Sequence, residues 1–170
     1  KGYFDEDRKK LIPFIPSRIG IITSPSGAVI QDMTKKIRER LPSNIILWPV
    51  AVQGPKSERD ITEAINGFND MPNKPEVIIL ARGGGSLEDL LSFNSDDVAD
   101  AIFASKIPII SAVGHETDFS ISDMVADIRA STPTAAADIV VPERVELLDK
   151  INNTFKLAKT NLENLLNMKY

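Results

Sequence analysis

The stretch that decides the fold spans residues 76–86 and reads EVIILARGGGS. Its first part is a continuous run of apolar residues, which is typical of a strand buried on both faces of a parallel sheet. Its second part places Arg82 directly before three consecutive glycines. Because every glycine raises the entropic cost of ordering a chain, such a loop after a buried strand indicates close approach of the backbone to a ligand. This stretch therefore predicts both a class of sheet and a binding edge.

The same order, an apolar strand followed by a turn and a helix, recurs along the chain. The predicted strands are residues 19–23, 45–50, 76–80 and 108–111. The predicted helices are residues 28–41, 58–68, 87–91 (one short turn), 96–105 and 118–128. Ser57 is interpreted as an N-cap with Asp60 completing a capping box. Repeated strand–helix units predict an α/β fold, a Rossmann-like three-layer domain with a mainly parallel sheet.

The tail has a different pattern. Residues 143–170 contain no glycine or proline, and apolar residues recur at heptad spacing. The two sets of seam positions are Leu148, Phe155 and Leu162, and Ile151, Ala158 and Leu165. This spacing predicts a helix that starts a coiled coil, whereas the alternative is an amphipathic helix packed on its own domain. We therefore expect a domain over residues 1–142 and a helical region over residues 143–170.

Composition restricts the classes of function. The 170 residues are 42% hydrophobic and 26% charged, which is ordinary for one globular domain with an extension. The absence of cysteine excludes disulfides and thiolate metal sites and suits the cytoplasm. No apolar run reaches the length of about 18 residues that a transmembrane helix needs, so no membrane association is expected. The chain begins without methionine, which suggests a fragment of a longer protein.

The net charge of −4 and the isoelectric point of about 5.1 do not indicate a nucleic-acid-binding domain, which is usually basic. Polyanion binding would need a partner domain or a local basic patch. One candidate patch is the run of basic residues on the predicted helix 28–41: Lys35, Lys36, Arg38 and Arg40. The alternative is that this run is only a solvated helix face.

Three polar clusters follow three different strands and should meet at one edge of the sheet. The first, residues 24–32, contains Ser24 and Ser26 at a helix N-terminus, which suits an anion, and Asp32 one turn into that helix. Its alternative is an ordinary capped turn with Asp32 exposed. The second cluster is Arg82 with the glycine loop. Its alternative is a flexible loop in which Arg82 pairs with Glu88 or Asp89.

The third cluster, residues 114–118, contains the only histidine of the chain, His115. Histidine is the side chain whose unperturbed pKa lies near neutrality, so His115 is a candidate for proton transfer. If a helix starts here, His115 and Asp118 share a face. The alternative is a surface-loop histidine without a role. A hydroxyl-rich loop over residues 130–137, which contains Thr132 and Thr134, is expected downstream.

Together these residues suit phosphodiester hydrolysis. Arg82 would stabilise charge on the phosphoryl group, and His115 would transfer a proton. Asp32 and Asp118 would orient these groups or bind a divalent metal such as Mg²⁺; no metal or other cofactor is assigned. The predicted substrate contacts are the glycine and hydroxyl residues of the loops: Ser24, Ser26, Gly83, Gly84, Gly85, Ser86, Thr132 and Thr134.

At these residues the chain resembles the exodeoxyribonuclease VII large subunit family. The similar stretches are SRIGIITSPSGA (17–28) with Asp32, ARGGGSLEDL (81–90) with Phe93 and Asn94, GHETD (114–118), and VADIRASTPTAA (125–136). The resemblance covers residues 1–142, and the tail is similar to the start of that family's long coiled coil. It implies the catalytic residues Asp32, Arg82, His115 and Asp118.

The resemblance also implies an activity and partners. The family degrades single-stranded DNA from either end into 5′-phosphorylated oligonucleotides and nucleotides, without a strict need for metal. It implies small subunits along the coiled coil, and an N-terminal OB-fold that binds single-stranded DNA and is not part of this sequence. The sequence leaves two alternatives to this function open. One is a Rossmann-like enzyme that binds a nucleotide through Gly83–Gly85, and the other is a DNA-binding scaffold that oligomerises through its tail without cleavage.

Overall fold

The computed structural model describes residues 2–83, 87–114 and 118–167. Five strands form one sheet in the order β2-β1-β3-β4-β5, and every neighbouring pair is parallel. The strands are β1 (Arg18–Thr23), β2 (Asn44–Pro49), β3 (Val77–Ala81), β4 (Ile109–Ala112) and β5 (Ile128–Arg129). The predicted α/β class with a parallel sheet is therefore confirmed, and the sheet contains one strand more than the sequence indicated.

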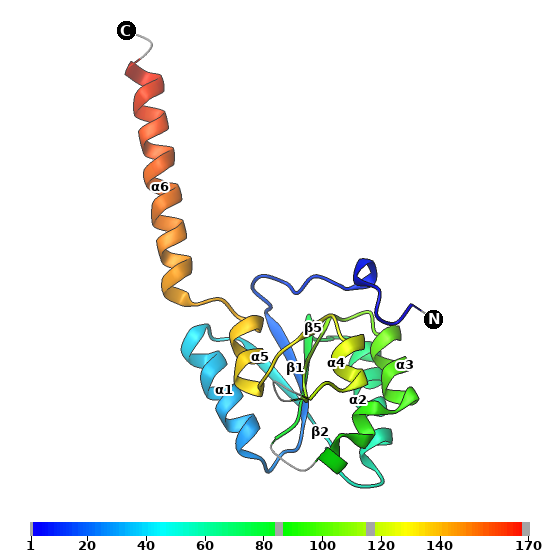
Figure 1. Cartoon of the computed structure of the whole chain (residues 1–170). Coiled ribbons are helices and arrows are strands. Elements are labelled where there is room, and N and C mark those ends of the chain that lie inside the picture. Colours follow the sequence, from blue (N-terminus) through cyan, green and yellow to red (C-terminus); the bar gives the residue numbers. More distant parts are fainter. Residues whose placement is uncertain (1, 84–86, 115–117, 168–170) are drawn as a thin grey trace.

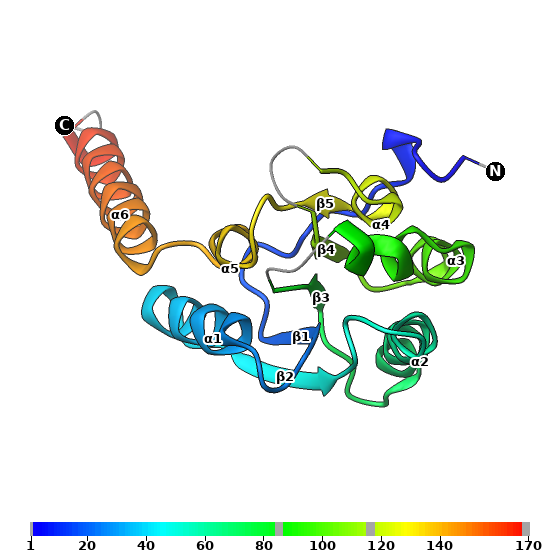
Figure 2. The same ribbon diagram turned by 60° about the horizontal axis from the view of Figure 1, so that its bottom comes forward.

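Helices cover both faces of this sheet. Figure 2 shows α1 (Ala28–Arg40) and α5 (Pro133–Val140) on one side, with α2 (Ser57–Asp70), α3 (Asp96–Ala104) and α4 (Ile121–Val125) on the other. Successive residues of one strand enter different cores: Ile21 packs under α1 and α5, whereas Ile22 packs under α2 and α3. Two buried faces explain why the strands are continuously apolar rather than alternating.

The strand order creates a crevice at one position. The chain leaves β1 through α1 to reach β2 on one side, whereas β3 lies on the other side of β1. In parallel sheets, ligands bind beyond the carboxyl ends of the strands where the connections diverge in this way. The loops that follow β1 and β3 are those with Ser24–Gly27 and with Arg82, so the fold places two of the predicted clusters beside this point.

A helix is present within the predicted range 118–128, but its predicted bounds are wrong. In the structure α4 begins only at Ile121, because Ser120 and Asp123 form a capping box: the Ser120 hydroxyl accepts from the Asp123 N–H at 3.1 Å, and the Asp123 carboxylate accepts from the Ser120 N–H at 3.0 Å. The helix ends at Val125, and the chain then enters β5 beside β4. The short strand was missed because it has only two residues.

Two other local predictions are also wrong. Residues 133–140, predicted in part as a hydroxyl-rich loop, form α5, which begins at Pro133 with the Thr132 hydroxyl accepting from the Ala135 N–H at 3.0 Å. Ser57 is the first residue of α2 rather than its N-cap, and its hydroxyl donates to the Gly54 carbonyl at 2.6 Å. In both cases a short-range hydrogen bond, which spacing alone cannot reveal, fixes the start of the helix.

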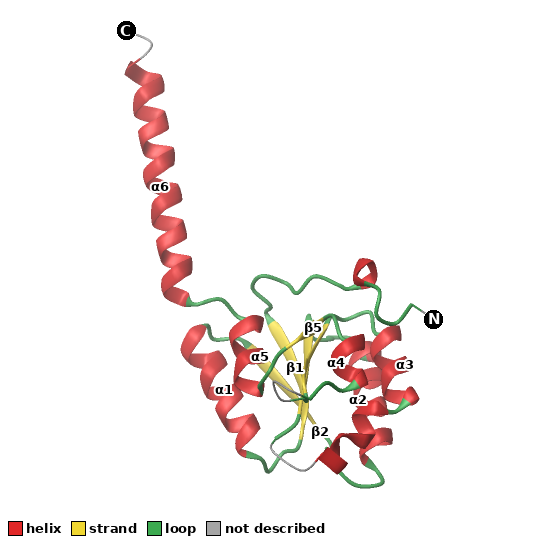
Figure 3. Cartoon of the chain, viewed as in Figure 1, coloured by secondary structure: helices red, strands yellow, loops and turns green. Residues whose placement is uncertain are grey.

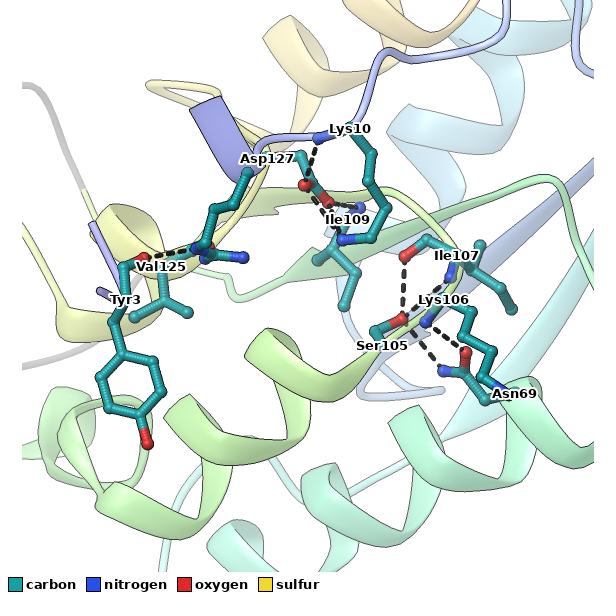
Figure 4. A network of polar contacts seen from close by, with 10 residues as sticks. Tyr3, Lys10, Asn69, Ser105, Lys106, Ile107, Ile109, Val125 and Asp127 are labelled. Atoms are coloured by element: carbon teal, nitrogen blue, oxygen red, sulfur yellow. Dashed lines mark hydrogen bonds and ion pairs between the residues drawn. The ribbon is translucent and has the colours of Figure 1, made fainter. Parts of the chain in front are cut away.

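The segment before β1, which contains the 3₁₀ helix η1 (Glu6–Arg8), is attached to the edge of the sheet opposite the crevice (Figure 4). The Asp127 carboxylate accepts from the backbone N–H groups of Lys10 and Ile109, both at 2.7 Å, and pairs with the Lys10 ammonium at 3.1 Å. The Arg8 guanidinium donates to the carbonyls of Tyr3 and Val125. These contacts connect the start of the chain to β4 and to the end of α4.

The last helix, α6 (Arg144–Asn167), extends away from the α/β body (Figures 1 and 3). Its seam is exposed, with Leu148 at 48%, Ile151 at 63% and Phe155 at 71%. The predicted tail helix is thus confirmed, and the alternative of an amphipathic helix packed on its own domain is not what the structure shows. The coiled coil stays a prediction. Among the described residues, no helix is long and apolar enough to cross a membrane.

A Gly67→Ala substitution in α2 tests the packing of β2 against this helix. A Cβ atom at residue 67 would lie 2.7 Å from Cζ3 of Trp48, whose indole packs edge-on against Phe68 at 5.2 Å between ring centroids. We expect this overpacking to lower the free energy of unfolding by about 1–3 kcal/mol, although alanine is favoured over glycine in helices by about 1 kcal/mol. Urea unfolding followed by circular dichroism measures the change.

The control is the same substitution in a Trp48→Leu background, where the smaller side chain leaves room for the new methyl group. There, Gly67→Ala should be neutral or stabilising. An equal loss in both backgrounds would show that the indole is not the cause.

Candidate active site

A cavity of about 260 Å³ lies at the point where the connections from β1 and β3 diverge. It is lined by residues at or after the ends of three strands: Thr23, Ser24, Gly27 and Val29 for β1, Ala51, Val52 and Gln53 for β2, and Arg82 and Gly83 for β3. A second cavity of about 90 Å³ shares Val29, Arg82 and Gly83, and extends to the loops after β4 and β5. The two cavities therefore form one crevice along the carboxyl edge of the sheet.

A larger hollow of about 510 Å³ lies elsewhere, along the outer surface of α1. Its lining comes from a single helix, and its basic residues are Lys35 and Arg38. Two other basic residues of α1 are engaged in ion pairs. Lys36 pairs with Asp138 at 3.3 Å, and Arg40 pairs with Asp138 at 2.9 Å. These pairs attach α1 to α5, so two of the four basic residues predicted as a phosphate track have a structural use. We assign the candidate site to the crevice, where several elements converge.

Arg82 lies between the two cavities and lines both. Its backbone N–H donates to the Ala112 carbonyl at 3.2 Å, which holds the end of β3 beside the end of β4. The residue is only 4% exposed, so its guanidinium charge is largely desolvated and acts more strongly on a neighbouring anion than a surface charge would. Glu88 and Asp89, its alternative partners, lie outside the described side chains.

The N-terminus of α1 faces the same crevice. Gly27 is its N-cap and no side chain caps the helix, so the first backbone N–H groups lack the usual hydroxyl or carboxylate partner. The first turn also contains no acidic residue. Ser24 lines the cavity, and its hydroxyl lies 3.4 Å from that of Ser26. Uncapped N–H groups and the positive end of the helix dipole favour an anion at this point.

Asp32 is exposed on α1, one turn before Lys36. Lys36 pairs with Asp138 of α5, and Asp32 and Thr134 lie one turn earlier on α1 and α5, respectively. The Thr134 hydroxyl is 3.0 Å from that of Thr132, which lines the smaller cavity. Thr132 thus lines the crevice, whereas Asp32 lines neither cavity.

The loop after β4 closes tightly on itself. A Cβ at Gly114 would collide with the Asp118 carbonyl and lie 2.6 Å from Oδ2 of Asp123, so the backbone requires glycine there. Asp118 is half-buried and precedes α4 by more than one residue, so it is not helical. The sequence placed His115 and Asp118 on one face only if a helix starts at these residues, and Asp118 does not lie in a helix. His115, like Gly84, Gly85 and Ser86, lies outside the described residues.

Sequence reasoning missed the part that Asp123 plays in this loop. The buried carboxylate accepts four hydrogen bonds: from the Ser111 hydroxyl at 2.6 Å, the Gly114 N–H at 3.2 Å, the Ser120 N–H at 3.0 Å and the Ser120 hydroxyl at 2.8 Å. The capping-box spacing of Ser120 and Asp123 was the available signal. Asp123 thereby fixes both ends of the segment that carries His115 and Asp118.

Glycine at position 83 is explained by the space around it. A Cβ there would lie 3.2 Å from Cγ2 of Val29, so a side chain would narrow the crevice between the two strand ends.

In the part of the chain that the structure describes, no three histidine, aspartate or glutamate side chains gather into a metal-binding group.

The chain is similar to known proteins over almost its whole length. Residues 3–170 match the model of the family described as "Exonuclease VII, large subunit". The chain belongs to this family. Proteins named exodeoxyribonuclease 7 large subunit are 52% identical over 168 residues in Anaplasma phagocytophilum, 54% over 168 in Rickettsia bellii and 53% over 169 in Chlorobaculum tepidum.

These alignments cover 99%, 98% and 97% of this chain, and 42%, 38% and 42% of the three relatives, respectively. The chain therefore spans about two fifths of the length of the curated relatives it matches.

Proposed function

We propose that this chain carries the catalytic part of an enzyme that hydrolyses phosphodiester bonds in single-stranded DNA, from either end, to give 5′-phosphorylated oligonucleotides and nucleotides. The observation that carries the proposal is the buried Arg82 beside the uncapped N-terminus of α1 in one crevice. Both groups attract a phosphate, and they approach it from different strands. Membership of the exonuclease VII large subunit family supports the same activity.

The proposed reaction divides the work among the four candidate residues. Arg82 and the N-terminus of α1 hold the non-bridging oxygens of the scissile phosphate and stabilise the charge that grows on them. Water attacks the phosphorus atom, the bond to the 3′ oxygen breaks, and the phosphate stays on the 5′ oxygen. His115 transfers a proton between water and the leaving 3′ oxygen, while Asp118 and Asp32 orient the water and the imidazole.

Asp32 and Asp118 are also the residues that would bind a divalent metal such as Mg²⁺, which would polarise the phosphate or the attacking water. For partners, we propose that the exposed seam of α6, including Leu148 and Phe155, binds the small subunits of the same nuclease. A cysteine-free chain with this activity suits the cytoplasm, where we propose that the enzyme acts.

The test uses the complete large subunit assembled with its small subunits, on end-labelled single-stranded DNA. We expect His115→Ala to lower the cleavage rate by at least about 10²-fold, with DNA binding unchanged. Asp118→Asn should also lower the rate, whereas Asp70→Asn, an exposed aspartate at the end of α2 far from the crevice, should not. Cleavage by both site variants at the wild-type rate would rule out the catalytic assignment.

Parallel reactions with EDTA decide the role of the carboxylates. Loss of cleavage that Mg²⁺ restores would assign Asp32 and Asp118 to metal binding, and unchanged cleavage would assign them to orienting water. A wild-type complex that binds DNA but never cleaves it would support a scaffold instead. Saturable binding of a mononucleotide in the crevice without cleavage would support a nucleotide-binding enzyme.

A further inference from the structure

An exposed aromatic ring lies in the loop after β4, between Asp118 and the start of α4. Phe119 is 62% exposed, and the Arg129 guanidinium lies over its ring, with Cζ 4.0 Å from the centroid. Arg129 is the last residue of β5, and Ser131, two residues further on, lines the smaller cavity. The ring is therefore attached to the carboxyl edge of the sheet from two sides, through the loop after β4 and through the end of β5.

The contact with Arg129 holds the exposed ring of Phe119, a large apolar surface, in one orientation. A guanidinium stacked on one face of the ring limits its rotation, and the exposed area then belongs to the opposite face and the ring edge. A ring that is already held in place loses little conformational entropy when a second planar group stacks on it. Phe119 thus has the properties of a preformed stacking surface rather than of a core residue left outside.

Position distinguishes Phe119 from the other exposed aromatic rings. Phe155 belongs to the seam of α6, and Phe14 lies beside Lys150 of that helix. Phe103 forms a similar pair with Arg8 at 4.8 Å, but it lies at the end of α3, at the opposite edge of the sheet. Among the exposed phenylalanines of the described residues, Phe119 is the one that lies at the carboxyl edge of the sheet, in the loop that also contains Gly114.

We propose that the open face of Phe119 stacks on a nucleobase of the DNA strand whose phosphate lies at Arg82. This inference rests on the proposed function and adds the group that recognises the base. Stacking on an aromatic side chain accepts every base, because each has a π-face, and it needs a base that is free of its duplex neighbours. Phe119 would therefore contribute to the preference for single strands without adding a sequence preference.

The test compares Phe119→Leu, Phe119→Trp and the control Phe103→Leu in the complete enzyme with its small subunits. The substrates are two single-stranded oligonucleotides of equal length, one with normal bases and one with abasic sites throughout. On normal DNA, Phe119→Leu should raise KM by about five- to a hundredfold with little change in kcat. Phe119→Trp should stay close to wild type because tryptophan also stacks, and so should Phe103→Leu.

The abasic substrate separates stacking from other roles. Without bases there is nothing to stack on, so wild type and Phe119→Leu should have the same KM there. An equal loss on both substrates, or no loss on normal DNA, would overturn the inference. So would a failure of Phe119→Leu to assemble with the small subunits in gel filtration, because the ring would then be a protein contact.

Failure of the proposed function has a different signature. If the wild-type complex binds single-stranded DNA without cleaving it, the activity is refuted. Fluorescence anisotropy with the same two oligonucleotides still measures whether Phe119→Leu removes the preference for DNA that has bases, so the stacking inference is decided independently.

Discussion

Replacing Arg82 by alanine is expected to lower kcat/KM for single-stranded DNA by about 10³-fold in the complete enzyme, and replacing it by lysine by about 10²-fold. The residue is 4% exposed and lines both parts of the crevice. Its charge is therefore held where water screens it weakly, in the lining of the crevice where we propose that the phosphate binds. Loss of the guanidinium removes the one cation that, among the described residues, lines both cavities.

Lysine should not restore the activity, although it keeps the charge. The guanidinium is a planar fork that can hold two phosphate oxygens at once, whereas an ammonium is a point charge on a flexible stem. If the role of Arg82 is to hold two oxygens as charge grows on them, the loss should appear mainly in kcat. If it only attracts DNA to the surface, lysine should suffice and the loss should appear in KM.

Single-turnover cleavage of end-labelled DNA, together with anisotropy for binding, measures both quantities. Arg40→Lys is the matched control, since Arg40 is also largely buried, at 16% exposure, but pairs with Asp138 and Glu143 at the other end of α1. That variant should be less stable and as active as wild type. Activity of Arg82→Ala within a few-fold of wild type would show that the crevice is not the site of cleavage.

The sequence was sufficient to predict the layers of this fold. The apolar run of β3 and its glycine loop indicated a strand buried on both faces, and the structure has all four predicted strands. What spacing could not supply was the exact start of short helices. The beginning of α4 depends on the bonds between Ser120 and Asp123, and that of α5 on the Thr132 hydroxyl. Local hydrogen bonds of this kind override a hydrophobic pattern.

The candidate site was predictable to a similar degree. Fold logic brought the loops after β1, β3 and β4 to one edge, and the structure places Ser24, Arg82 and Gly114 along one crevice there. The sequence left open whether the start of α1 is capped, and the structure shows no side-chain cap there. The burial of Arg82 was not predictable, because it depends on how neighbouring loops pack. Asp123 was overlooked although its spacing from Ser120 was visible, because the bonds from Ser111 and Gly114 depend on how the loop after β4 folds back.

The second large effect is expected at Asp123. Removing its carboxylate with Asp123→Ala leaves the N–H groups of Gly114 and Ser120 without their acceptor inside the protein. Buried donors that lose a charged partner are costly, so the free energy of unfolding should fall by about 3–5 kcal/mol. Asp123→Asn should cost less, about 1–2 kcal/mol, because its amide oxygen can still accept from both N–H groups while the Ser111 hydroxyl reverses to accept from the new NH₂.

Asp127→Asn provides the comparison that separates stability from catalysis. Asp127 also accepts from two backbone N–H groups, but these belong to Lys10 and Ile109, at the opposite edge of the sheet. Both asparagine variants should unfold at lower urea concentration. Only Asp123→Asn should also lower kcat in the complete enzyme, because Gly114 and Ser120 bracket the segment with His115 and Asp118. Equal kcat in the two variants would mean that Asp123 stabilises the fold without positioning the site.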